Sequence, residues 1–278
     1  YQNRYAEAFL YYHKGQMAAR EYGSQCHYAN LTASLGRMSY RQGKYRDAIP
    51  YFREAFVQAA HCDSTDFFNR IHIRQEQLAN IGLAYEQMGL YDSAIIFYNH
   101  ALDFIARNES LFPDESRSVD MARAVICGNL GSVYLKTGVF EKAGHLLQQS
   151  IQINNQPGYD HYDARLNEIK LAELHLATGK YPAAALAVRQ IRTALDTMPF
   201  EEAELRWRKL VWRYHDALGD TGQAYRSYQV YTAFKDSFES RRRELPGMNY
   251  QLIFDNYSKQ YQIEMLQKDN RLKALYLM

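Results

Sequence analysis

Five glycines recur along this chain at intervals of 46, 49, 41 and 40 residues, and the residues around them recur with them. Alanine lies five residues after every one of these glycines, and an aromatic residue lies two residues after the first four. A small residue, glycine or alanine, precedes each of the first four by seven residues. The five positions are Gly43, Gly89, Gly138, Gly179 and Gly219. Self-similarity at intervals of this length is typical of stacked repeats, so it constrains the whole chain to a repeat architecture.

The spacing inside each unit predicts two helices joined by a tight turn. Residues 78–88 place apolar side chains at three-and-four spacing, which gives a helix one apolar face. The following glycine ends this helix, because glycine adopts the left-handed C-cap conformation, and the second helix begins near the aromatic residue. We expect Gly36 and Gly82 where two helices cross closely, with aromatic rings beside them, which accounts for the 24 tyrosines. One hairpin cannot bury its own apolar face, so the units must stack into an all-α solenoid.

Composition argues against several other classes of protein. Lysine and arginine number 33 and aspartate and glutamate 31, so the net charge of +2 gives no general attraction to nucleic acid or anionic membranes. No run of about 18 apolar residues is present, so nothing within the sequence spans a membrane. Three cysteines are too few for a disulfide framework. The sequence begins at Tyr1 without a visible signal peptide, so we expect a piece of a longer protein.

Two units carry a family resemblance. The matching columns are Leu130, Gly131, Tyr134, Gly138, Phe140, Ala143 and Leu147 in one unit and Ile81, Gly82, Tyr85, Gly89, Tyr91, Ala94 and Tyr98 in another. Over roughly residues 1–238 the chain resembles the tetratricopeptide repeat family. The resemblance implies a right-handed α-solenoid that recognises a peptide or another protein. The family's usual unit has about 34 residues, so we expect the additional residues in loops at 63–65 and 113–115.

The repeat boundaries divide the chain into three parts. Residues 1–28 form an N-terminal half repeat, residues 29–238 form five repeats, and residues 239–278 form a C-terminal extended helix. The fifth unit has Trp212 in place of the small residue and Thr221 in place of the aromatic residue. Terminal units often depart from the pattern because they cap the stack.

In this family the first helix of each unit lines the concave surface, so the resemblance implies a binding surface there. Asn80 and Asn129 lie immediately before the apolar–small pair, where an amide offers both a donor and an acceptor to a peptide backbone. The alternative is that each asparagine bridges neighbouring helices. Helical phase predicts a surface made of Arg37, Arg41, Glu76, Asn80, Gln87, Asn129, Lys136, Arg206, Lys209 and Arg213.

The last three basic residues of this surface share one helix face and alternate with Trp207 and Trp212. Basic and aromatic residues together can bind nucleic acid. A single such helix in a chain of net charge +2 argues only weakly for a nucleic-acid site. An acidic peptide or a solvated end helix fits the pattern better, so we expect no nucleic acid partner through this chain.

The C-terminal segment differs from the repeats. Residues 249–278 contain no glycine or proline and favour helix, with an irregular seven-residue apolar pattern that weakly indicates a coiled coil. In the order of its parts, this segment is similar to the end of the sensor region of bacterial membrane-anchored histidine kinases. The parts are residues 235–238, a charged helix at 260–273 and an apolar end at 274–278. That resemblance implies a sensor on the periplasmic side of the inner membrane, leading to a membrane span and a kinase outside this chain. It is also compatible with a homodimer formed through the C-terminal helix.

Two other functions stay open at this point. One is a free-standing adaptor for protein assembly. The other is the sensor part of a cytoplasmic regulator with a DNA-binding output. The sequence names neither the peptide or protein partner nor the output that follows.

No catalytic motif is present. The sequence lacks the glycine-rich nucleotide signatures, the zinc-protease helix motif and the serine-hydrolase elbow. We therefore expect no enzyme activity, no catalytic residue, no cofactor and no metal in this chain.

Cysteine and histidine pairs at 26–27 and 61–62 allow three interpretations. Adjacent ligands splay apart on a helix, which favours separate, partly buried side chains over a zinc site. A disulfide between Cys26 and Cys62 in an oxidising compartment is the third.

Overall fold

The computed structural model describes residues 2–62 and 67–243, and this part of the chain is helical without β-strands. Three short helical turns, η1 (Phe68–His72), η2 (Glu109–Leu111) and η3 (Pro113–Glu115), accompany the α-helices. The α-helices are α1 (Gln2–Glu21), α2 (Gln25–Arg41), α3 (Tyr45–Ala60), α4 (Ile73–Gln87), α5 (Tyr91–Asn108), α6 (Ser116–Lys136), α7 (Phe140–Asn154), α8 (His161–Ala177), α9 (Tyr181–Thr197), α10 (Glu201–Ala217) and α11 (Thr221–Arg243). The predicted all-α class is confirmed.

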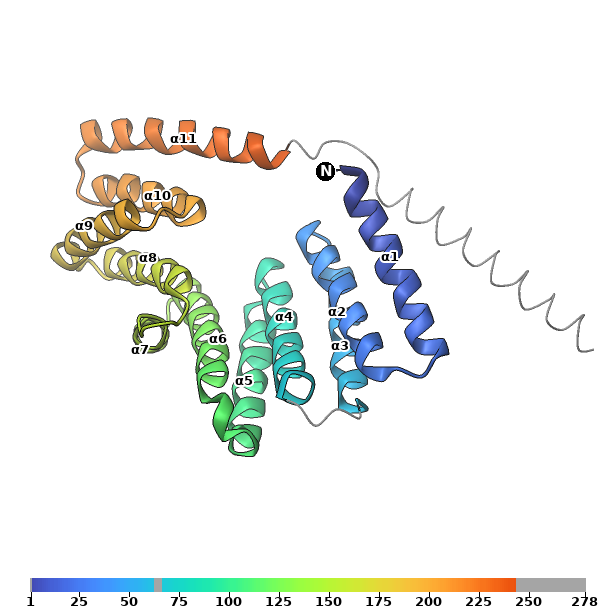
Figure 1. Ribbon diagram of the computed structural model, residues 1–278. Helices are drawn as coiled ribbons and strands as arrows, with labels where there is room; N and C mark the ends of the chain where they lie inside the picture. Colours follow the sequence, from blue (N-terminus) through green and yellow to red (C-terminus); the bar gives the residue numbers. More distant parts are fainter. Residues whose placement is uncertain (1, 63–66, 244–278) are drawn as a thin grey trace, which may run out of the picture.

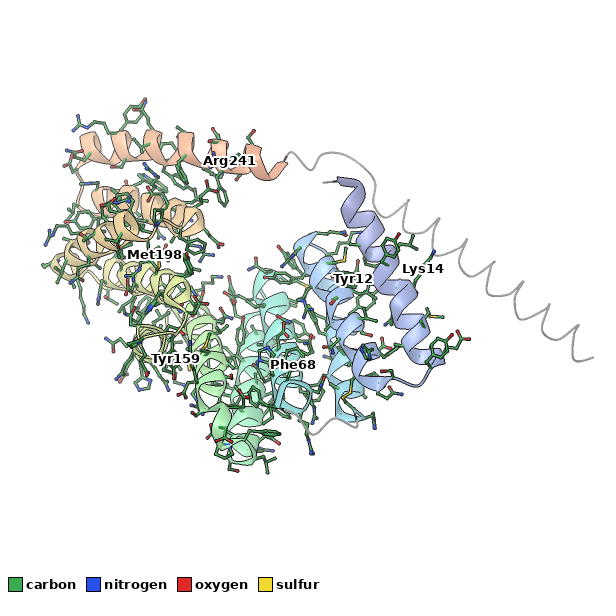
Figure 2. The ribbon with its side chains drawn as sticks, viewed as in Figure 1. Tyr12, Lys14, Phe68, Tyr159, Met198 and Arg241 are labelled. Atoms are coloured by element: carbon green, nitrogen blue, oxygen red, sulfur yellow. A yellow bond between two sulfur atoms is a disulfide. The ribbon has the colours of Figure 1, made fainter. Side chains whose placement is uncertain are left out.

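Consecutive helices pair into five hairpins, preceded by the single helix α1 (Figure 1). The hairpins are α2–α3, α4–α5, α6–α7, α8–α9 and α10–α11. In every hairpin the second helix begins two residues after the repeating glycine, at the position of the aromatic column. Side chains from both helices of each pair fill the space between them (Figure 2).

The turn between α4 and α5 shows how glycine ends the first helix of a pair. Gly89 has a φ of 73°, in the left-handed region. Its N–H donates to the carbonyl of Glu86 at 3.0 Å, and the N–H of Leu90 donates to the carbonyl of Tyr85 at 2.9 Å. These two bonds satisfy the last carbonyls of α4 in a Schellman motif. Gly23 adds a similar turn between α1 and α2, which the repeat pattern did not predict.

Small residues allow the two helices of a hairpin to cross closely. A Cβ atom on Gly82 would lie 2.8 Å from the ring of Tyr98, and one on Gly36 would lie 2.6 Å from the ring of Phe52. The predicted pairing of small and aromatic residues is therefore confirmed. The repeating alanines lie in the same interfaces, and the four with no exposed surface are Ala48, Ala94, Ala143 and Ala184.

The hairpins follow one another in an arc whose open side lies between α1 and α11 (Figure 1). The first helices contact one another in succession, from α2 through α4, α6 and α8 to α10. One large apolar cluster joins the second hairpin to α6, and another lies between α8, α9 and α10. The stack therefore presents a continuous row of first helices on one side.

The long second and third units owe their length to segments outside the hairpin pattern. Between α3 and α4 the chain forms η1, a π-helical turn that leads directly into α4. Between α5 and α6 it forms η2 and η3, and α6 itself has 21 residues. The predicted loop at 113–115 is therefore a 3-10 turn. The predicted loop at 63–65 lies outside the described residues.

The last described helix, α11, extends over 23 residues. The predicted boundary between residues 238 and 239 falls inside it, and the arginine run that begins at Arg241 is part of the same helix. Arg241 pairs with Glu201 of α10 at 3.0 Å (Figure 2). No described helix is long and apolar enough to cross a membrane. The predicted seven-residue pattern at 249–278 and the apolar chain end lie outside the described residues.

Candidate functional site

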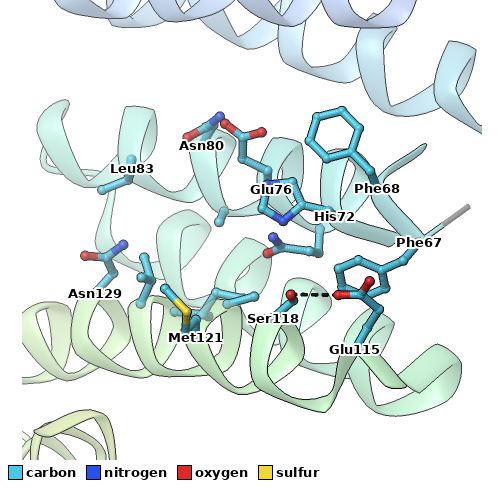
Figure 3. A pocket seen from close by; sticks show the side chains of 15 residues that line it. Phe67, Phe68, His72, Glu76, Asn80, Leu83, Glu115, Ser118, Met121 and Asn129 are labelled. Carbon is cyan, nitrogen blue, oxygen red and sulfur yellow. Dashed lines mark hydrogen bonds between the residues drawn. The ribbon is translucent and has the colours of Figure 1, made fainter. Parts of the chain in front are cut away.

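A groove of about 690 Å³ lies between α4 and α6, the first helices of the second and third hairpins (Figure 3). Both walls are helical, and most of the side chains between them are apolar. The α4 wall contributes Glu76, Asn80 and Leu83, and the α6 wall contributes Met121, Val125 and Asn129. An apolar groove with a few polar groups at fixed places is the usual form of a binding site.

One end of the groove is built by the extra segments of the chain. Phe67, Phe68 and His72 come from η1 and the residue before it, and Glu115 comes from η3. The ring of Phe68 stacks on His72 with 5.3 Å between centroids. The hydroxyl of Ser118 donates to the Glu115 carboxylate at 2.8 Å. The segments that lengthen the two units therefore shape the groove directly.

Three residues of the predicted binding surface meet in this groove: Glu76, Asn80 and Asn129. The Nδ2 atom of Asn80 is buried and has no hydrogen-bond partner within the described residues. A buried donor without a partner costs about 1–3 kcal/mol. Asn80 therefore carries a donor at the groove wall whose hydrogen bond no described residue accepts, and a ligand acceptor would reach it after a small rotation of the side chain.

Two further predicted residues are held by ion pairs beside the groove. Arg37 of α2 donates to Glu76 at 3.1 Å, which links the first hairpin to the groove wall. Lys136 of α6 donates to the buried carboxylate of Glu86 at 2.7 Å. Tyr98 donates to the same carboxylate at 2.9 Å. Lys136 and Glu86 therefore tie the C-terminal ends of α6 and α4 together, which stabilises the two helices that form the walls.

Family models described as tetratricopeptide repeat match residues 29–57, 78–108 and 124–157. These three segments match the tetratricopeptide repeat. The matched segments fall on the first three hairpins, which include both walls of the groove. No curated protein matches the sequence.

Solved structures with the same fold have low sequence identity to this chain. BtubC (BKLC) from P. vanneervenii superposes with a TM-score of 0.65 at 15% identity, over 84% of this chain and 92% of that one. The Rap conjugation gene regulator of plasmid pLS20, in complex with the Phr* peptide, gives 0.56 at 13% identity, over 88% and 63%. The kinesin light chain TPR-like repeats of Podosopora anserina give 0.53 at 17% identity, over 75% and 95%. These similarities confirm the predicted solenoid of tetratricopeptide-like hairpins.

The predicted basic residues of the fifth tetratricopeptide-like hairpin lie apart from the groove, on α10. Arg206 pairs with Glu202 at 2.6 Å, and Arg213 approaches Glu173 of α8 at 3.9 Å. Lys209 is exposed. The predicted surface therefore divides into a groove at the second and third repeats and a basic helix face at the end of the stack.

The remaining predicted residues, Arg41 and Gln87, are exposed in the last turns of α2 and α4. Neither lines the groove. The structure therefore brings together only part of the predicted surface.

Cys26 and Cys62 form a disulfide, with 4.9 Å between their Cα atoms. The favoured interpretation of separate side chains is therefore wrong. Cys26 lies in the first turn of α2 and Cys62 just after α3, and an antiparallel hairpin brings these two ends together. A zinc site would need both sulfurs as free thiolates, and in this structure they are bonded to each other. The bridge is the third of the three interpretations that the cysteine and histidine pairs allowed.

Prediction from repeat columns missed Phe67, Phe68, His72 and Glu115. Columns shared by all units select residues at equivalent helical positions, whereas these four belong to segments found in one unit each. The signal that could have found them is the surplus length of the intervals of 46 and 49 residues. A long connection in a compact domain often carries function.

Proposed function

We propose that this chain is a recognition scaffold that binds a peptide, or a segment of another protein, in the groove between α4 and α6. The observation that carries the proposal is the Asn80 amide, whose Nδ2 atom is buried at the groove without a partner among the described residues. The carbonyl of a peptide bond would accept this hydrogen bond. The proposed scaffold has no chemistry of its own.

The size of the groove supports the same proposal. Its volume of about 690 Å³ lies within the range of about 300–1,000 Å³ that is usual for ligand sites. The Rap regulator with a similar fold was solved in complex with the Phr* peptide. A solenoid of this shape can therefore hold a peptide, although at 13% identity only the fold is shared.

Selection from a random dodecapeptide phage library tests the proposal. Val125 lines the groove and is 39% exposed, so Val125→Trp should fill the groove without disturbing the core. Val57→Trp is the matched control, because Val57 is 51% exposed on α3 and does not line the groove. We expect peptides that bind the wild-type chain and Val57→Trp and lose binding to Val125→Trp. Recovery of no such peptides would contradict the proposal.

We further propose that the scaffold is the sensor region of a membrane-anchored signalling protein, with a histidine kinase as the output and the periplasmic side of the inner membrane as its location. The Cys26–Cys62 disulfide supports an oxidising compartment, because disulfides are rare in reducing ones. Helix α11 leads toward residues 244–278, whose sequence favours a helix that could pair with a second copy. A free-standing adaptor and a DNA-binding regulator are the rival functions.

The encoding gene beyond Met278 separates these functions. An apolar stretch of about 20 residues followed by a histidine-bearing kinase segment would support the proposed sensor. A helix-turn-helix segment without a membrane span would favour the DNA-binding regulator. A stop codon near Met278 would favour the adaptor and remove the signalling proposal.

A further inference from the structure

The groove between α4 and α6 carries negative charge without a matching positive charge. Among the described residues that line it, none is a lysine or an arginine, whereas Glu76 and Glu115 both are lining residues. Arg37 balances the charge of Glu76 across 3.1 Å. Glu115 accepts the hydroxyl of Ser118 at 2.8 Å and makes no ion pair within the part of the chain that the structure describes. One carboxylate at the end of the groove therefore lacks a counter-charge.

Aromatic rings lie at the same end as this carboxylate. Phe67 packs edge-on against Phe112 with 5.7 Å between centroids. Phe68 stacks on His72 and is 53% exposed, so one face of its side chain is open to a ligand. Figure 3 shows Phe67, Phe68, His72 and Glu115 gathered at one end of the groove. An exposed ring at the same end of the groove as a carboxylate suits a cationic side chain, because cation–π attraction and a charge-assisted hydrogen bond can then act on one group.

The rest of the groove offers apolar surface and side-chain amides, among them Asn80 and Asn129. Leu83 lies on the α4 wall near Asn129, Met121 lies on the α6 wall closer to Ser118 (Figure 3), and Val125 extends the apolar surface along α6. The unpaired Nδ2 atom of Asn80 lies along the α4 wall. An apolar side chain of the ligand would cover the apolar surface, and a peptide carbonyl would accept a hydrogen bond from the Nδ2 atom of Asn80.

We propose that the groove selects a peptide segment in which an apolar residue lies near a lysine or arginine. The apolar side chain packs on the apolar lining that Leu83, Met121 and Val125 contribute, and the basic side chain reaches Glu115 at the end of the groove that Phe68 also lines. Asn80 donates to a carbonyl of the peptide backbone between these two side chains. This inference rests on the proposed peptide-binding function and adds the chemical class of the peptide. It is opposite in charge to the partner that the basic face of α10 would suit.

The dodecapeptide library that tests the proposed function also tests this inference, through the sequences that it returns. Peptides retained by the groove should be enriched in lysine and arginine over aspartate and glutamate, close to an apolar residue. A fluorescent peptide made from the enriched sequences should bind at least about tenfold more tightly than the same peptide with its basic residue replaced by glutamine. Tenfold is the lower end for a hydrogen bond to a charged group.

Glu115→Gln tests whether the Glu115 carboxylate causes the preference for the basic peptide. Glutamine keeps an acceptor for Ser118 but removes the charge, so this variant should lose most of the preference for the basic peptide over its glutamine counterpart, and only the cation–π part should remain. Asp114→Asn is the matched control, because Asp114 is an exposed carboxylate of the same turn η3 and does not line the groove. This control should keep the tenfold preference.

The outcomes distinguish this inference from the proposed function. Peptides that need an open groove at Val125 but show no basic preference, or an acidic one, would overturn the inference and leave the proposed function standing. A basic preference that keeps its full size in Glu115→Gln would also overturn it. Absence of any groove-dependent peptide would overturn the proposed function itself. The comparison of two peptides on the wild-type chain decides the question even where a variant fails to fold.

Discussion

Gly82 of α4 and Tyr98 of α5 fit together so closely that a methyl group on Gly82 would lie 2.8 Å from the tyrosine ring. Tyr98 has no exposed surface, and its hydroxyl donates to the carboxylate of Glu86 at 2.9 Å. The tyrosine therefore cannot move away without breaking a buried hydrogen bond. This pair sets the spacing of the hairpin whose first helix forms one wall of the groove.

Gly82→Ala should destabilise the chain, because the added methyl group must push the two helices apart. Overpacking of this kind costs about 1–3 kcal/mol in the free energy of unfolding, which urea denaturation measures. Gly222→Ala in α11 is the matched control, since a Cβ there has no neighbour closer than 3.7 Å. The control should be neutral or stabilising by up to about 1 kcal/mol. Equal unfolding midpoints for the two variants would contradict the close crossing.

Replacing both Cys26 and Cys62 by serine should lower the free energy of unfolding by about 2–4 kcal/mol, because the bridge closes a loop across 36 positions of sequence. Thermal unfolding with and without a reductant measures the effect. The wild-type chain should lose stability when reductant is added, whereas the double variant should not change. A reductant effect of the same size in the double variant would show that the stabilisation comes from elsewhere.

Asn80→Ala combined with Asn129→Ala should weaken the binding of a groove-dependent peptide. Each lost hydrogen bond is worth roughly 1–1.5 kcal/mol, so the double variant should bind about 30- to 150-fold more weakly. Isothermal titration measures the affinity, and circular dichroism checks that the helices remain. Unchanged affinity with intact helices would mean that the two asparagines only bridge neighbouring helices.

Stability should fall as the pH rises above about 10, the ordinary pKa of tyrosine. Burial raises the pKa of Tyr28 and Tyr40 to about 12, with neighbouring carboxylates adding to the shift, and it raises the pKa of Tyr98 as well. Above pH 10 the unfolded chain releases phenolic protons that the folded chain keeps. The folded state then binds more protons, so its stability declines with increasing pH.

Tyr98→Phe tests this pH dependence. Phenylalanine has no proton to release, so the stability of the variant should decline less steeply between pH 10 and 11 than that of the wild-type chain. Urea denaturation at closely spaced pH values measures the two slopes. Identical slopes would mean that the Tyr98 hydroxyl does not contribute, whatever the stability of the variant at pH 7.

The hairpins could be predicted from the sequence because each depends on contacts between neighbouring segments. At the end of α4, the N–H groups of Gly89 and Leu90 donate to carbonyls that lie three and five residues earlier in the chain. Gly82 and Tyr98 meet across one tight turn. Such local relationships repeat from unit to unit, and the repetition makes them visible as columns.

The candidate site could be predicted only in part. Asn80, Asn129 and Glu76 occupy repeated helical positions, so the column pattern found them. Glu115 and Phe68 lie in segments that occur once each, and nothing in the repeat indicates where those segments fold.

The sequence by itself determined the helix hairpins, their glycine turns and the row of first helices, because these follow from local periodicity and from the steric needs of close crossings. Only the tertiary structure decided that Cys26 meets Cys62 and that Arg37 balances Glu76. It also decided that the extra segments close one end of the groove around an uncompensated Glu115. These features depend on which surfaces meet when hairpins stack, and that is set by packing between residues far apart in the chain.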